Sequence, residues 1–149
     1  MNTLRFDFDH LPGPVNMNHP GRYGARHRRS MGVHRVVKEM LTKRGDLPEE
    51  PYQRFEVHFL FYYPTLNDYD MENSRAASKP YIDALVKEGV LAKDDMKHLY
   101  RDYMDWEHRP DAPGFSIVIT PADGGRLCPI CWSNLEKHLG GLTDTAPSL

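Results

Sequence analysis

The feature that most constrains the fold is an alternation of apolar and polar side chains between residues 54 and 61. Phe55, Val57, Phe59 and Phe61 alternate with Arg54, Glu56, His58 and Leu60. Successive side chains of a strand point to opposite faces, so this period of two predicts a β-strand. Pro64 and Asn67 then close the strand into a polar loop. A strand needs partners for its backbone N–H and C=O groups, which directs attention to other strand-like segments.

Three further segments have the character of strands. Residues 3–8 place Leu4, Phe6 and Phe8 on one side. Residues 99–106 and 115–119 are also strand-like, and the segment 108–114 between them holds two prolines. We therefore expect residues 108–114 to join the last two strands as an antiparallel pair.

Two segments have the spacing of amphipathic helices. The first follows a loop predicted from Asp9 to about Ser30 and ends near Gly45, and its apolar stripe comprises Val33, Val36, Val37, Met40 and Leu41. The second is predicted from about Ser78 to Glu88, with Ser78 as N-cap, Pro80 in the first turn and Gly89 as the stop. The buried stripe predicted for it comprises Tyr81, Ile82, Ala84 and Leu85.

These elements predict an α/β fold with the order β-α-β-α-β-β, in which a small mixed sheet is accompanied by two helices. The 149 residues suit a single domain. We place that domain in residues 1–120 and treat residues 121–149 as a C-terminal tail.

Composition indicates an ordinary globular chain located in the cytoplasm. No apolar run approaches the ~18 residues that cross a bilayer, so we expect no membrane association. The first eight residues do not have the basic and then apolar pattern of a signal peptide. The two cysteines stand together at Cys128 and Cys131, which is not a disulfide framework and favours a reducing compartment.

Positive charge is concentrated between residues 20 and 44, where eight Arg or Lys side chains are opposed by a single Glu, although the whole chain has a net charge of −2. Such a segment suits binding to the phosphates of DNA. The candidate DNA-binding residues are Arg22, Arg26, Arg28, Arg29 and Arg35. Charge alone equally allows a solvated basic helix face with no partner.

The candidate catalytic residues are four acids and one lysine: Asp70, Glu72, Lys79, Asp94 and Asp95. In extended backbone, Asp70 and Glu72 would point to the same side, and the acids at 94 and 95 follow the second helix. If these carboxylates meet, their repulsion calls for a hard cation such as Mg²⁺. Lys79, in the expected first turn, would then face a phosphate or departing oxyanion. The alternative is that the acids are merely solvated and that Asp83 pairs with Lys79 four residues away.

The order of these residues resembles the signature of the RusA family of Holliday junction resolvases. That family has D-x-D-N, then K-x-x-x-D-A-L, a glycine, and D-D. Here the corresponding residues are Asp70-x-Glu72-Asn73, Lys79-x-x-x-Asp83-Ala84-Leu85, Gly89 and Asp94-Asp95. The resemblance covers roughly residues 3–120.

The resemblance implies a RusA-like fold and a homodimer that introduces paired nicks into four-way DNA junctions with Mg²⁺ or Mn²⁺, in DNA recombination and repair. It implies that Asp70, Glu72 and Asp95 bind the metal, that Asp94 has a lesser or shared role, and that Lys79 is the catalytic lysine. The chain departs from the family in having Glu72 in place of an aspartate. It also has three extra residues between Asn73 and Lys79 and one extra residue before Asp94. The first of these insertions allows Arg75 to share the role of the lysine.

The sequence is also compatible with two other functions. One is a non-catalytic module that binds branched DNA through the basic segment. The other is a nuclease that acts on flaps, forks or other branched DNA.

The tail carries Cys128-x-x-Cys131, which has the spacing of half a zinc knuckle. His138, His108 or the cysteines of a second subunit would complete a Zn²⁺ site. The alternative is a reduced thiol pair in an appendage that binds a partner.

Overall fold

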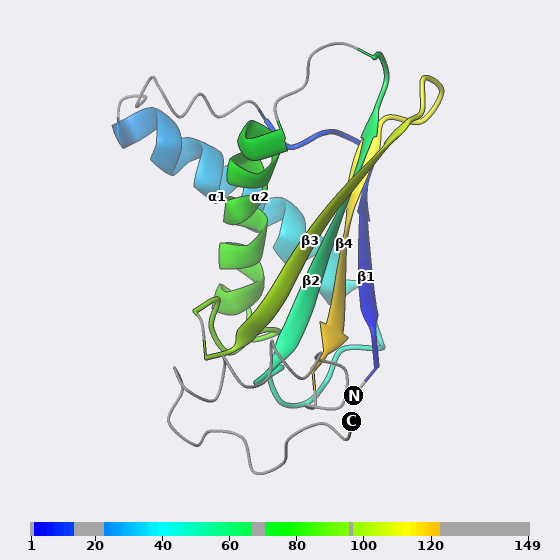
Figure 1. Cartoon of the computed structure of the whole chain (residues 1–149). Coiled ribbons are helices and arrows are strands. Elements are labelled where there is room, and N and C mark those ends of the chain that lie inside the picture. The colour runs from blue at the N-terminus through cyan, green and yellow to red at the C-terminus, as the bar shows by residue number, and fades with distance from the viewer. Residues whose placement is uncertain (1, 14–22, 67–70, 96, 123–149) are drawn as a thin grey trace, which may run out of the picture.

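The computed structural model describes residues 2–13, 23–66, 71–95 and 97–122, of which residues 23–29 and 71 are described by their backbone alone. They form a mixed α/β fold with a four-stranded sheet and two helices, in the order predicted from the sequence (Figure 1). The elements are β1 (Leu4–Phe8), α1 (Tyr23–Thr42), β2 (Phe55–Tyr63), α2 (Met71–Lys87), β3 (Leu99–His108) and β4 (Gly114–Pro121).

The strand order is β1-β4-β2-β3, so the prediction that β3 and β4 pair with each other is wrong. Strand β4 pairs antiparallel with both β1 and β2, and β3 pairs parallel with β2. The reason is twofold. A helix between two strands permits a parallel crossover, which is what α2 provides between β2 and β3. In addition, β4 has no exposed residue and suits a central position, while the more polar β3, whose second half is mostly exposed, suits an edge.

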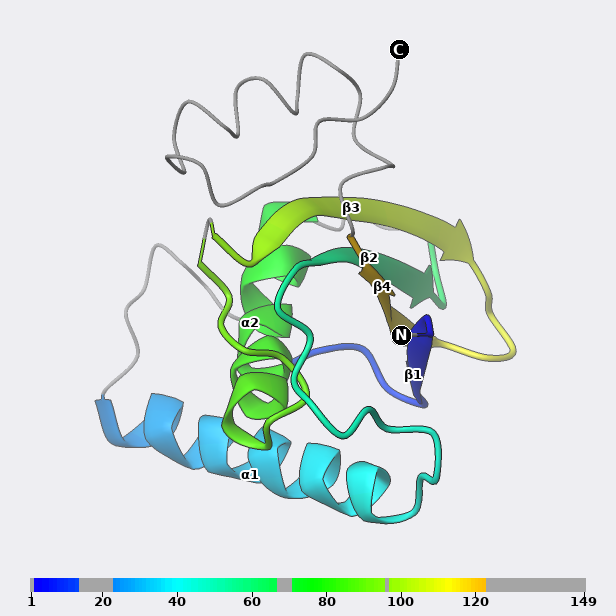
Figure 2. The same cartoon turned by 90° about the horizontal axis from the view of Figure 1, so that it is seen from below.

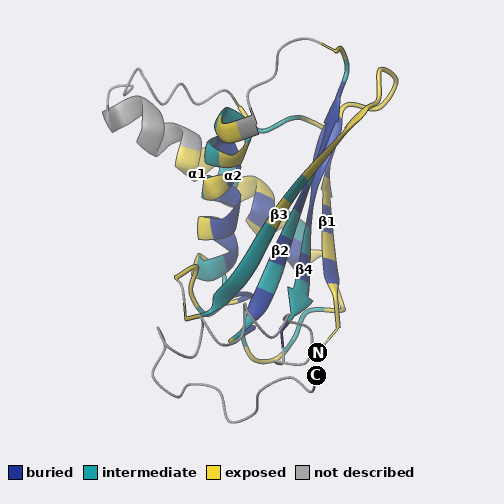
Figure 3. Ribbon diagram, in the orientation of Figure 1, coloured by how far each residue is buried: buried dark blue, intermediate teal, exposed yellow. Residues whose placement is uncertain are grey.

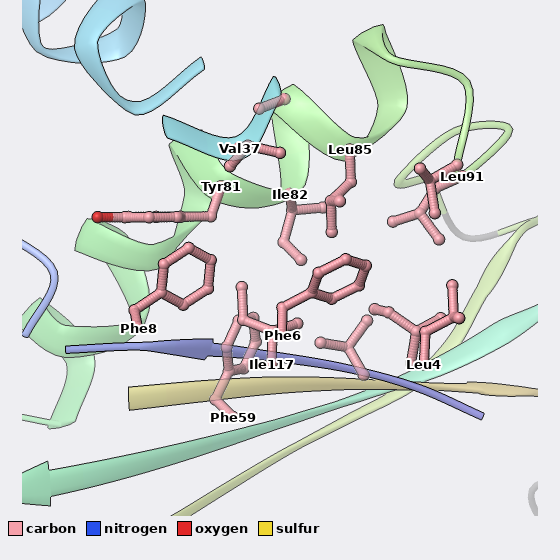
Figure 4. Close-up of a cluster of buried hydrophobic side chains, with 14 of the residues drawn as sticks. Leu4, Phe6, Phe8, Val37, Phe59, Tyr81, Ile82, Leu85, Leu91 and Ile117 are labelled. Carbon is pink, nitrogen blue, oxygen red and sulfur yellow. The ribbon is translucent and has the colours of Figure 1, made fainter. Parts of the chain in front are cut away.

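Both helices cover one face of the sheet, and the core lies between them and the strands (Figures 1 and 2). Phe6, Phe61 and Phe115 are each at most 1 % exposed. The ring of Phe115 lies 4.8 Å from that of Tyr81 on α2, and Figure 4 shows Tyr81, Ile82 and Leu85 above Phe6 and Phe8. Full burial of each such side chain contributes about 1.5–3 kcal/mol. The predicted stripe of α2, comprising Tyr81, Ile82, Ala84 and Leu85, is confirmed as buried.

Helix α1 begins at Tyr23, so the last eight residues of the loop predicted for residues 9–30 are helical. The sequence did not predict the first turns of α1, because these turns are rich in Arg and His and have no periodic apolar residues. Val37 and Leu41 are buried as expected, and Val33 and Met40 pack against the core. The prediction is wrong for Val36, which is 38 % exposed.

Helix α2 begins at Met71, seven residues before the predicted N-cap. Ser78 is therefore not a cap: it is fully buried within the helix, and its Oγ donates a hydrogen bond to the Ser74 carbonyl at 2.8 Å. Pro80 lies inside the helix and not in its first turn. Lys79 is thus far from the helix N-terminus, and the expected help from the helix dipole does not apply to it.

The predicted stop at Gly89 is confirmed. Gly89 has a φ of +78°, the left-handed region that glycine adopts without strain. Its N–H bonds to the carbonyl of Val86, and the N–H of Val90 bonds to that of Leu85. This is the Schellman pattern that ends many helices, and it directs the chain into the turn that carries Asp94.

Neither described helix is long and apolar enough to cross a membrane.

Candidate functional site

A cavity of about 360 Å³ lies between α2 and the strands β2 and β3. Its apolar lining includes Val57, Phe59 and Ile82. Its ionisable lining comprises Glu72, Arg75, Lys79, Asp94 and Asp102. In Figure 3 the first part of β3, which borders this region, is mostly intermediate in burial and its second half is mostly exposed, whereas the neighbouring strand β2 alternates between buried and intermediate residues and ends buried. The cavity therefore combines an apolar wall with charged groups that water can reach.

Lys79 is at the centre of the polar lining. Its Nζ lies 2.9 Å from Oδ2 of Asp94 and 3.1 Å from Oδ1 of Asp83. The pairing of Lys79 with Asp83, which the sequence offered as part of the alternative to a metal site, is observed. The hydrogen bond to Asp94, opposed by partial burial and assisted by Asp83, raises the pKa of Lys79 above 10.5. Lys79 is therefore a cation at every physiological pH, and it joins α2 to the turn after it.

Asp94 and Asp95 are adjacent in sequence but have different surroundings. Asp94 lines the cavity and contacts Lys79. Oδ1 of Asp95 instead accepts hydrogen bonds from His98 Nδ1 at 2.5 Å and from the Lys97 N–H at 3.0 Å. The hydrogen bond from His98 is the main reason that the pKa of Asp95 lies below its usual value. Asp95 thus shapes the turn, and Asp94 faces the cavity.

Glu72 also lines the cavity, from the first turn of α2. The expectation that residue 72 lies in extended backbone is therefore wrong. Seven residues of helix separate Glu72 from Lys79, which is about 10 Å along the axis. Asp70, which directly precedes α2, lies outside the described residues. Among residues 2–13, 23–66, 71–95 and 97–122, no three His, Cys, Asp or Glu side chains are grouped closely enough to hold a metal ion.

Asp102 is a site residue that sequence reasoning missed. It forms an ion pair with Arg75 of α2, between Oδ2 and Nη2. In the sheet it is paired with Val57, whose side chain belongs to the core. Because strand residues two apart share a face, Asp102 is in phase with Met104, which packs against the core. The sequence signal that could have identified Asp102 is an acidic residue at a strand position that faces the core.

Helix α1, which carries most of the basic segment, lies on the other side of α2 from β3 (Figure 2). Arg35 is exposed on α1. Arg26, Arg28 and Arg29 lie in α1, where their side chains are not described, and Arg22 lies outside the described residues.

The possible zinc ligands of the tail, Cys128, Cys131 and His138, lie outside the described residues, so a Zn²⁺ site stays a prediction. His108, another candidate ligand, ends β3, where its Nε2 lies 3.2 Å from the Pro64 carbonyl oxygen.

No protein-family model and no curated protein matches this chain. The resemblance to the RusA resolvases therefore rests on the motif residues themselves.

Proposed function

We propose that the protein is a Mg²⁺-dependent DNA endonuclease that resolves four-way junctions. The observation that carries the proposal is the meeting of separate motif fragments at one cavity. Lys79 contacts Asp94, fifteen residues further along the chain, and Glu72 lines the same cavity. Residues that resemble a nuclease signature in sequence are thus also neighbours in space.

The donor chemistry of the cavity suits Mg²⁺. Glu72, Asp94 and Asp102 supply carboxylate oxygens, and Mg²⁺ commonly takes one or two protein carboxylates and completes its shell with water. We assign Glu72 and Asp94 as ligands, together with Asp70 on the strength of the resemblance. The bound metal would supply an activated water and stabilise charge on the phosphate. Mn²⁺ takes similar oxygen ligands and is expected to substitute.

Lys79 is the residue we assign to the phosphate. It stays protonated, and its Nζ extends from α2 into the polar part of the cavity. A phosphate oxygen would replace one of its two carboxylate partners. The apolar residues Val57 and Phe59 form the opposite wall of the cavity. The wild-type cavity therefore offers a fixed cation to the charge that develops on the scissile phosphate.

The basic helix α1 would hold flanking phosphates beyond α2, with Arg35 as its described exposed arginine. A homodimer would bring two such sites to opposed strands of a four-way junction, because the dimer and the junction each have two-fold symmetry. A cytoplasmic location belongs to the same proposal.

The test is cleavage of a labelled four-way junction, with its linear duplex, a flap and a fork as comparisons. We expect paired nicks in the junction with Mg²⁺ or Mn²⁺ and none with EDTA. Faster cutting of flaps or forks would assign the protein to the wider class of branched-DNA nucleases. Equal cutting of the linear duplex would contradict structure selectivity.

A second function, a non-catalytic module for branched DNA, is favoured by one observation. Two of the cavity's acids already have cationic partners, in the pairs Lys79–Asp94 and Arg75–Asp102. These pairs offset the repulsion that would otherwise call for a metal. Salt-sensitive junction binding without nicking in any divalent cation would support this alternative.

A further inference from the structure

We infer that Arg75 and Asp102 extend the site: Arg75 binds the phosphate beside Lys79, and Asp102 is the positioning residue that holds Arg75 until phosphate and cation arrive together. This inference rests on the proposed function, since it concerns the same cavity.

The first argument is geometric. Arg75 precedes Lys79 by four residues, so both cations lie on the same side of α2, and both line the cavity. Asp102 approaches Arg75 from the edge strand, and the ion pair joins one guanidinium nitrogen, Nη2, to the carboxylate. A guanidinium presents its donors as a planar fork, so it can bind a carboxylate and a phosphate along different edges, or exchange one for the other.

The second argument is the charge of the cavity. Its lining holds two cations, Arg75 and Lys79, and three carboxylates, those of Glu72, Asp94 and Asp102, which gives a formal charge of −1. Asp83, the other carboxylate partner of Lys79, adds a further negative charge beside this lining. A phosphodiester alone would increase the excess of negative charge, and a divalent cation bound with it would offset that increase. The lining therefore favours a phosphate bound together with a divalent cation over a phosphate bound alone.

The third argument is partner exchange. In the structure Lys79 contacts Asp94 and Asp83, and Arg75 contacts Asp102. When both ions enter, the phosphate takes the two cationic side chains, the metal takes Asp94 with Glu72, and the negative charge of Asp102 supports the nearby metal. The metal thus removes carboxylates that compete with the phosphate for Lys79 and Arg75, and the phosphate removes cations that compete with the metal for the carboxylates. By thermodynamic linkage, each ion must then raise the affinity for the other by the same factor.

The experiment measures binding of the four-way junction with EDTA and with Ca²⁺, a hard cation that takes oxygen ligands. Asp102→Asn is expected to tighten metal-free binding roughly two- to fivefold, because it frees Arg75. Its half-saturating Mg²⁺ concentration for cleavage should rise. Arg75→Gln is expected to show the reverse: weaker metal-free binding and a lower Mg²⁺ requirement. In the double variant, Ca²⁺ should enhance DNA binding less than in the wild type.

Glu107→Gln is the matched control, because Glu107 is on the same strand but on the opposite face, paired with Arg109 at 2.7 Å. It should leave both measurements unchanged. If Asp102→Asn and Arg75→Gln both weaken metal-free binding, or match the control, the pair only ties α2 to β3 and the inference is wrong.

A measurement on the wild type guards against variants that fail to fold. Inorganic phosphate and Mg²⁺ together should raise the thermal midpoint by more than the sum of their separate effects, and a purely additive rise would contradict the inference. A wild type that binds junctions without cutting them would instead refute the proposed nuclease. The inference would then still be tested by metal-free binding, which Asp102→Asn should tighten and Arg75→Gln should weaken.

Discussion

Two charged regions of this protein share residue types but differ in how their ion pairs are built. On the sheet face away from the helices, Arg5 and Asp7 are two residues apart on one strand, and Nε lies 2.8 Å from Oδ1. Ser116 of the neighbouring strand donates to the same Asp7 oxygen at 2.5 Å. In the cavity, by contrast, Lys79 and Arg75 reach acids on segments far along the chain.

The comparison shows what separates a structural polar network from a candidate site. Strand geometry holds the Arg5–Asp7–Ser116 network in place, and Ser116 is fully buried. The Lys79 and Arg75 pairs instead line a cavity of about 360 Å³, whereas exposure does not separate the two regions: the Lys79 side chain is 63 % exposed, and those of Arg5 and Asp7 are 51 % and 65 % exposed. A ligand can therefore replace the partners in the cavity, while the network contributes to stability. The following predictions test that division.

The largest effect is expected from Lys79→Ala. It should lower junction cleavage about 100- to 1000-fold, the range for losing one preorganised charge-stabilising group. The thermal midpoint should hardly change, because exposed ion pairs contribute about 0–1 kcal/mol. Arg5→Ala, the matched loss of an exposed cation from the network, should leave cleavage unchanged. A similar loss of cleavage in both variants would contradict the division between a functional cavity and a structural network.

The next effect separates the two adjacent acids. Asp94→Asn should lower cleavage by about 10- to 100-fold, while Asp95→Asn should retain cleavage within a few-fold, because Asp95 is committed to His98 and the turn. Rates of single-turnover cleavage check this order. The reverse order would support the assignment of Asp95 as the metal ligand that the RusA resemblance implies.

A moderate effect on stability is expected in the network. Ser116→Ala should lower the free energy of unfolding by about 1 kcal/mol and leave cleavage unchanged. Chemical denaturation measures the first quantity and the junction assay the second. A loss of cleavage without a loss of stability would place Ser116 in the functional machinery.

The network should also show in the pH dependence of stability. Burial opposes the ionisation of Asp7, but hydrogen bonds from Ser116 and Arg5 outweigh it and lower its pKa below 3.8. A lowered folded pKa stabilises the protein above the unfolded pKa, and this contribution is lost as the pH falls through the folded value. The stability advantage of the wild type over Asp7→Asn should therefore shrink below pH 3.8. A pH-independent difference would contradict it.

The smallest effect is expected on α1. Arg35→Ala should weaken junction binding a few-fold and reduce the slope of log affinity against log salt by about one. A salt titration of wild type and variant measures both. An unchanged slope would mean that Arg35 contacts no phosphate.

Local spacing was enough to predict much of this molecule. The alternation at 55–61 predicted β2 and Gly89 predicted the end of α2. The four-residue separation also offered the contact between Lys79 and Asp83, as an alternative to a metal site. In each case the interacting groups lie within a few residues, so strand or helix geometry alone determines where their side chains point.

The tertiary structure decided the rest. It inserted β2 between β3 and β4, extended α2 back to Met71, turned Asp94 and not Asp95 toward Lys79, and brought Asp102 to Arg75. Such outcomes depend on how whole elements pack, because burial of the apolar faces selects strand order and register. The sequence alone thus pointed to the carboxylates and the lysine, and packing chose which of the described ones share a cavity.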